Sequence, residues 1–79
     1  MEVKLYYFGM IAEVVHKDYE ILTITAPIEI KELKKLLTHR YPILNNKKYR
    51  IAVNQSLTHK NQMIYKNDEI ALLPPFAGG

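Results

Sequence analysis

Apolar and polar side chains alternate over the first residues of the chain, a pattern typical of a β-strand with one buried face. Over residues 2–9, the inward positions are Val3, Leu5 and Tyr7, and the outward positions are Glu2, Lys4, Tyr6 and Phe8. Residues 10–18 are expected to form a helical turn or a loop. Residues 19–26 are rich in β-branched side chains and are predicted to return as a second strand.

A helical period follows over residues 29–41, between Pro27 and Pro42. The predicted buried stripe consists of Ile30, Leu33, Leu36, Leu37 and Tyr41. No Ser, Asp or Asn stands directly before Ile30, so the sequence predicts a poorly capped helix N-terminus.

Shorter β-type segments make up the second half of the chain. Residues 49–54 are predicted to form a third strand, and a fourth, very short strand is expected around 57–58. Residues 61–68 are interpreted as a loop whose Met63 and Ile64 fill the core. A last strand is expected up to Pro74, with its inward side chains Ile70 and Leu72 and its outward side chains Ala71 and Leu73.

This order of elements predicts an α+β protein of the β-grasp (ubiquitin-like) type. We expect a mixed sheet of four to five strands, covered by one main helix and followed by a flexible Gly-Gly tail. The first and last strands are predicted to lie side by side and parallel at the centre of the sheet. The 79 residues form one domain, 1–79, in which 75–79 are a projecting tail.

Composition narrows the possible chemistry. The chain has no cysteine, which excludes a disulfide scaffold, a thiolate zinc site and a cysteine nucleophile. His16, His39 and His59 are scattered over different elements, so no metal site is expected. No apolar run approaches a membrane span and the N-terminus does not resemble a signal peptide, so we expect a cytoplasmic protein.

The net charge is +3, and much of the positive charge lies in "KELKKLLTHR" and "NNKKYR". The simpler interpretation is a solvated helix face and a loop. The alternative is a docking surface for an acidic partner or nucleic acid, although no RNA-binding aromatic motif or recognition helix supports nucleic acid.

Two outward residues have no evident role in a core. If the first and last strands are parallel neighbours, Phe8 and Leu73 lie together at one edge of the sheet, which indicates a protein-binding patch. Loop residues that fold over the pair are the alternative. Leu57 fits either arrangement.

The chain ends in "LLPPFAGG". Pro74 and Pro75 end the sheet ladder and favour a stiff, extended segment. Gly78 and Gly79 have no side chains, so they would fit a channel too narrow for other residues. The chemistry that such a tail offers is its terminal carboxylate, which a partner must first activate, most simply as an acyl-adenylate. A frayed terminus is the structural alternative.

The chain as a whole resembles the small subunit of molybdopterin synthase, the MoaD-type sulfur carriers. "LLPPFAGG" is similar to their "FPPVxGG" ending, "IAVNQSL" to their "AVNxxL" strand, "KNDEIALLPP" to their last hairpin and "LYYFGMIAEVV" to their first strand and loop. Ala12 replaces the usual arginine of the first loop, with Glu13 retained. Phe76 is bulkier than the usual valine, and Leu73 replaces a common aromatic residue.

The resemblance implies a non-catalytic, sulfur-donating subunit. A ubiquitin-activating-type enzyme would adenylate the Gly-Gly terminus with ATP and magnesium, and a sulfur donor protein would convert it to a thiocarboxylate. The tail would then enter the large subunit of a heterotetramer and give sulfur to cyclic pyranopterin monophosphate. This chain itself would bind no cofactor.

Carried onto this sequence, the resemblance makes Gly79 the thiocarboxylate carrier, accompanied by Gly78. The insertion would be lined by Pro74, Pro75, Phe76 and Ala77, and the docking positions would be Phe8, Leu57 and Leu73. Three alternatives stay open: a thiamine-type sulfur carrier, a ubiquitin-like modifier that conjugates to lysines, and a plain β-grasp interaction module.

Overall fold

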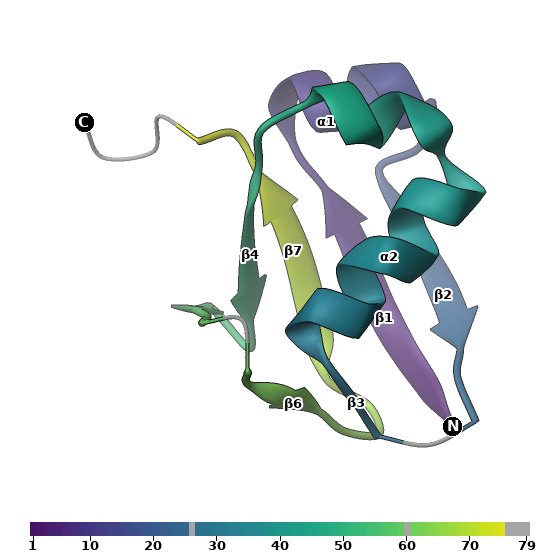
Figure 1. Ribbon diagram of the computed structural model, residues 1–79, viewed down its shortest axis with the longest axis vertical. Helices are drawn as coiled ribbons and strands as arrows, with labels where there is room; N and C mark the ends of the chain where they lie inside the picture. Colours follow the sequence, from purple (N-terminus) through teal and green to yellow (C-terminus); the bar gives the residue numbers. More distant parts are fainter. Residues whose placement is uncertain (26, 60, 76–79) are drawn as a thin grey trace.

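A mixed sheet forms one layer of the molecule and helices cover one of its faces (Figure 1). The computed structural model describes residues 1–25, 27–59 and 61–75. In chain order the elements are β1 (Glu2–Tyr7), α1 (Gly9–Val15), β2 (Tyr19–Thr23), β3 (Ile28–Glu29), α2 (Ile30–Arg40), the 3-10 helix η1 (Pro42–Asn46), β4 (Arg50–Val53), β5 (Ser56–Leu57), β6 (Met63–Ile64) and β7 (Glu69–Leu73).

The main sheet has five strands in the order β2-β1-β7-β4-β5. β1 and β7 are parallel, with Tyr7 opposite Leu72, and the other pairs are antiparallel. The chain's first and last strands therefore lie together at the centre, as predicted. The β-grasp prediction is confirmed: α2 is the main helix expected, and within the described residues the segment expected as a helical turn or loop contains a second α-helix, α1.

The core lies between this sheet and α2. Leu5, Ile70 and Leu72 from the central strands have no exposed surface, and neither have Leu33 and Leu37 of the helix. Each such side chain contributes about 1.5–3 kcal/mol through burial, before the entropy of ordering is subtracted. The two central strands are thus anchored in the core.

The prediction of the buried helical stripe is wrong for one residue, Leu36. Leu36 is 42% exposed. It lies about 60° around the helix from Leu33, on the side away from Leu37, because successive residues advance by about 100°. The sheet contacts only the narrower stripe that contains Ile30, Leu33 and Leu37, so Leu36 remains at the surface.

The start of α2 is better capped than the sequence indicated. The backbone N–H of Glu29 donates to Glu32 Oε1 at 3.2 Å, which is the reverse half of a capping box. A glutamate at each of these positions therefore replaces the Ser, Asp or Asn that the prediction required.

Several predicted boundaries also shift. The second strand, expected over residues 19–26, ends at Thr23, because Thr23 pairs with Glu2 where β1 begins. Helix α1 begins at Gly9, so Phe8 precedes a helix and is not the last residue of β1. The segment around Met63 and Ile64 is not a loop, since it pairs with β3 as a separate two-stranded sheet.

Candidate docking face and tail root

One row of side chains crosses the open face of the main sheet from edge to edge. Strand register places Tyr6 opposite Tyr19 on one side and opposite Ala71 on the other. Ala71 is in turn opposite Ala52, and Ala52 is opposite Leu57. All five strands thus contribute one apolar or aromatic residue to this row, which we call the open-face row.

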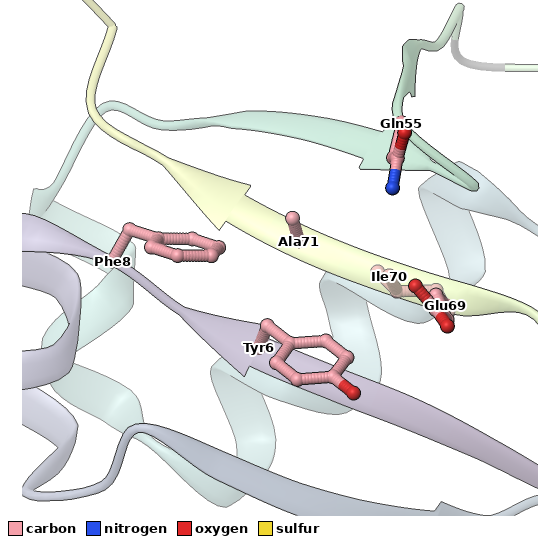
Figure 2. Close-up of a pocket in the computed structure, with 6 residues that line it drawn as sticks. All are labelled: Tyr6, Phe8, Gln55, Glu69, Ile70 and Ala71. Carbon is pink, nitrogen blue, oxygen red and sulfur yellow. The ribbon is translucent and has the colours of Figure 1, made fainter.

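The side chains of the row are large at its two ends and small at its centre. Tyr6 and Tyr19 pack with ring centroids 4.9 Å apart, Tyr19 is 42% exposed, and Leu57 is 53% exposed. Between them, a hollow of about 220 Å³ lies over Ala71. Figure 2 shows Tyr6 and Phe8 on one side of this hollow and Gln55 on the other, and the remaining lining residues are Glu69 and Ile70.

Phe8 and Leu73 come together at one end of the open face, in the way that strand alternation predicted. The Phe8 N–H donates to the Leu72 carbonyl oxygen at 3.2 Å, which keeps Phe8 level with the end of β7. The Phe8 side chain is 47% exposed, whereas Leu73 is half-buried. Leu57 shares this face but lies apart on the outer strand β5, because β7 and β4 separate it from β1.

A glycine that the sequence analysis did not single out supports the root of the tail. Gly9 has φ +55°, and a Cβ added there would lie 2.9 Å from Pro74 Cγ. Gly9 therefore allows both a left-handed backbone and close packing of the proline ring. The sequence signal was a glycine directly between a strand and a helix.

Pro74 is half-buried against this glycine, and Pro75, after it, is exposed. The tail thus starts at the end of a central strand, next to Phe8 and Leu73. The remaining predicted tail residues, Phe76, Ala77, Gly78 and Gly79, lie outside the described residues.

A buried carboxylate forms a second polar feature, on the helix-covered side of the sheet. Glu20 lies on the inner face of β2 and is only 9% exposed. Its Oε2 accepts hydrogen bonds from the hydroxyls of Tyr7 at 2.5 Å and Tyr41 at 2.6 Å. Its Oε1 accepts from Lys17 at 3.3 Å and from Arg40 at 3.2 Å.

These contacts decide the ionisation of the cluster. Burial opposes a charge on Glu20, but the Tyr41 and Tyr7 hydroxyls, Lys17 and Arg40 outweigh it and hold the pKa of Glu20 below its ordinary value of 4.5. Burial, together with the hydrogen bond to Glu20, raises the pKa of Tyr7 far above its ordinary value of 10.0. Glu20 is therefore an ionised carboxylate at neutral pH.

The role of this cluster is structural. Glu20 joins β1, β2, the segment before β2 and the end of α2 through its partners. Its oxygens are occupied by these donors, so the carboxylate is not available as a base or a nucleophile. The sequence analysis missed the cluster because strand pairing and the end of a distant helix bring its members together.

Other site types find no support in the part of the chain that the structure describes. No group of three or more His, Cys, Asp or Glu side chains there is placed to hold a metal ion. Within the same residues, neither helix has the length and apolar character needed to cross a membrane.

Known proteins match this chain over nearly its full length. A curated relative, the molybdopterin synthase sulfur carrier subunit of Caenorhabditis briggsae, is 29% identical over 100% of the chain and 99% of its own length. Among solved structures, subunits 1 and 2 of the molybdopterin-converting factor of Helicobacter pylori form a complex that includes a similar chain. That chain has a TM-score of 0.69 and 26% identity, with 100% of both chains covered.

The small archaeal modifier protein SAMP1 of Haloferax volcanii has the same fold, with a TM-score of 0.83, 18% identity and 100% of both chains covered. The family model that matches is the ThiS family, over residues 5–79. This match includes every strand of the open face, the root of the tail and the terminal glycines. The chain belongs to the ThiS family.

Proposed function

We propose that this protein is the sulfur-carrying small subunit of a molybdopterin synthase, with the sulfur held on Gly79. Membership of the ThiS family supports a sulfur carrier with a reactive C-terminus. The full-length similarity to a molybdopterin synthase sulfur carrier subunit supports this synthase over other destinations of the sulfur.

The observation that carries the proposal is the double role of β7. This strand contributes Ala71 and Leu73 to the open face, and it continues directly into Pro74. A partner that docks on the open face is therefore held at a fixed distance from the start of the tail. Docking of the partner on the open face would therefore also bring the C-terminus to that partner.

The proposed chemistry takes place at the terminal carboxylate. One carboxylate oxygen of Gly79 attacks the α-phosphate of ATP on a ubiquitin-activating-type enzyme that uses magnesium, and pyrophosphate leaves. A sulfur donor protein then supplies sulfur at the oxidation level of sulfide, which attacks the acyl carbon and forms the C–S bond as the bond to AMP breaks and AMP leaves. The resulting thiocarboxylate gives its sulfur to cyclic pyranopterin monophosphate in the large subunit, and hydrolysis restores the carboxylate.

The roles of the chain's own residues follow from this scheme. Gly78 and Gly79 supply a terminus without side chains, and Pro74 to Ala77 form the inserted arm. Phe8, Leu57 and Leu73 form the apolar contact with the large subunit. The complex of the two H. pylori subunits supports such a partner, because its small chain is similar to this one over its entire length.

A second candidate function is conjugation to lysines as a ubiquitin-like modifier. The likeness to the H. volcanii modifier favours it only at the level of the fold. Both functions begin with the same adenylate and differ in whether sulfur or a lysine amine attacks it.

An intact-mass measurement separates these functions. The protein is incubated with its activating enzyme, ATP and a sulfur source, and the proposal predicts the mass increase for replacement of one oxygen by sulfur. The variant that lacks Gly79 serves as control and should show no increase. Lysine conjugates without any thiocarboxylate would favour the modifier instead.

A binding measurement tests the docking face. Phe8→Ala should weaken binding of the large subunit by about tenfold or more, since truncation of an anchoring side chain at an interface costs about 1–2 kcal/mol or more. Tyr65→Ala is the matched control, because Tyr65 is 56% exposed and, unlike Phe8, does not line the hollow beside Ala71. Equal affinities for both variants would show that the open face is not the interface.

A further inference from the structure

Positive charge is concentrated in one continuous segment of the chain. Residues 31–50 contain seven of the eleven lysines and arginines but only one of the eight acidic residues, Glu32, an excess of six positive charges. This segment comprises nearly all of α2, the 3-10 helix and the start of β4. The remainder of the chain is acidic, so the protein is strongly polarised.

Three of these seven cationic residues, Lys34, Lys35 and Arg50, line two neighbouring hollows that share Lys34. The first, of about 170 Å³, lies between α2 and β4 and is lined by Lys34, Arg50 and His59 over the apolar side chains Ile30, Tyr49 and Ile51. The second extends it along α2 past Lys35 and His39. Among the described lining residues of either hollow there is no carboxylate. We call the two together the basic groove.

Among the described residues, the charges of the groove are not neutralised by carboxylates. Across residues 1–25, 27–59 and 61–75, the ion pairs are those of Lys17 and Arg40 with Glu20, and neither cation lines the groove. Lys34, Lys35 and Arg50 are exposed and lack a carboxylate partner in that part of the structure. The Lys34 ammonium lies 5.6 Å from the centre of the Tyr49 ring, a cation–π contact that orients it beside the groove.

The shape of the groove indicates what kind of anion fits. It lies between α2 and β4, and among the described residues the pairing on the β5 side of β4 includes Val53 and Ala52 and ends at Ile51, whose carbonyl oxygen accepts from the Thr58 N–H at 3.1 Å. The Tyr49–Arg50 segment is therefore at the edge of the sheet, where an extended peptide can lie alongside the strand. Nucleic acid fits less well, because Tyr49 is the only Phe, Tyr or Trp among the described lining residues and Lys34 lies over one face of its ring.

We propose that the basic groove binds an extended, acidic segment of a partner protein. Arg50 is opposite Leu73 in the β4–β7 ladder, so one end of the groove lies next to the root of the tail. Ile30 and Ile51 form the floor of the groove on the helix-covered side of the sheet, whereas Arg50 alternates with Ile51 and is paired with Leu73. The groove therefore extends from α2 to the edge of the open face.

This inference goes beyond the proposed function and is tested with the protein alone. A fluorescein-labelled peptide of alternating Glu and Val is titrated at low salt and followed by fluorescence anisotropy, with oligo(U) RNA and a Lys-Val peptide as competing probes. ¹H–¹⁵N spectra of the same titration should shift at Lys34, Lys35 and Arg50. Oligo(U) that binds more tightly and shifts the same amides would overturn the proposal in favour of a nucleic-acid site.

Charge reversal in the groove provides the decisive comparison. The double variant Lys34→Glu with Arg50→Glu should weaken the acidic peptide by about tenfold or more, since two close charge pairs are lost and two repulsions are introduced. Lys66→Glu is the matched control, because Lys66 is exposed in the turn before β7 and outside the groove. The affinity of this variant for the acidic peptide should stay within about twofold of that of the unaltered protein. If Lys66→Glu weakens binding of the acidic peptide as much as the double variant does, the proposal is refuted. It is also refuted if the unaltered protein does not bind the peptide.

Lys34→Gln with Arg50→Gln keeps the test valid if the double reversal does not fold. These neutral variants remove the two charges without new repulsion and should weaken the peptide by about threefold to tenfold. Circular dichroism melting curves confirm that each variant is folded. If the folded neutral variant binds the acidic peptide with unchanged affinity, the proposal is also refuted.

Discussion

Replacing the buried carboxylate of Glu20 by an amide should destabilise the fold more than any other single charge removal. Glu20→Gln keeps the shape of the side chain and an acceptor for the Tyr7 and Tyr41 hydroxyls, but removes the charge. Hydrogen bonds to charged groups contribute about 1.5–3 kcal/mol, against about 0.5–1.5 kcal/mol for neutral ones. Loss of charge at two buried hydroxyl contacts therefore costs about 2–3 kcal/mol.

The two cations of the cluster add little to this figure. The side chains of Lys17 and Arg40 are 43% and 48% exposed, so solvent screens their attraction to Glu20. A loss of about 2 kcal/mol is a large share of the stability of a small domain. It should lower the urea midpoint by about 1–2 M for an m-value of about 1–2 kcal/mol/M, and the melting temperature by about 8 °C or more.

The same residue predicts a pH dependence with a definite sign. The pKa of Glu20 is lower in the folded protein than its ordinary value of 4.5, so the folded state binds this proton less readily. Its stabilisation is complete above pH 4.5 and disappears as the pH falls through the folded-state value. The stability difference between the unaltered protein and Glu20→Gln should therefore narrow in acid.

Glu13→Gln is the matched control, because Glu13 is exposed and should change the free energy of unfolding by less than about 0.5 kcal/mol. Urea titrations followed by circular dichroism, from neutral pH to below pH 4, measure both effects. If Glu20→Gln is as stable as the unaltered protein at neutral pH, the Tyr–Glu contacts do not carry the stabilisation assigned to them. A gap that stays constant in acid would contradict the pKa argument.

Further predictions concern the tail and the face beside it. Deletion of Gly79 should abolish thiocarboxylate formation in the mass assay while the urea midpoint stays unchanged; a lower midpoint would show that the tail is part of the fold. Gly9→Ala should cost about 1–2 kcal/mol in thermal unfolding, from the left-handed backbone alone, and shift the NMR signals of Pro74; wild-type values would contradict the close packing there. Ala71→Phe should fill the hollow and weaken large-subunit binding in calorimetry with little change in melting temperature, whereas full affinity would mean that no partner side chain enters the hollow.

Much of the fold could be predicted because alternation and helical period are local signals. The alternation of β1 and β7 identified both faces of the central strands, and hence placed Phe8 and Leu73 at one end. The pairing of Ile28–Glu29 with Met63–Ile64 could not be predicted, since two-residue strands have no period of their own. Leu36 was assigned to the core because period alone does not say how wide the contacted stripe is.

The candidate site was predicted only in its apolar part. Phe8 and Leu73 stand out from the sequence because they are apolar at outward positions, whereas Leu57 was a docking position only through the family resemblance. Glu20 and Gly9 do not, because their importance depends on residues that approach from elsewhere in the chain: Tyr41 from the end of α2 in one case, Pro74 in the other. Contacts of this kind are set by the packed structure and have no local pattern.

The central position of β7 has a mechanical consequence. Its hydrogen bonds run to β1 on one side, where they are slanted, and to β4 on the other, where they are perpendicular to the strand, so both ladders lie across the direction in which the chain leaves towards Pro74. A partner that pulls on the tail along this direction applies a shear force to both ladders. The hydrogen bonds of both ladders then resist the force together, so they do not break one after another. The domain should therefore stay folded and move as a rigid body when the tail leaves one partner and binds the next.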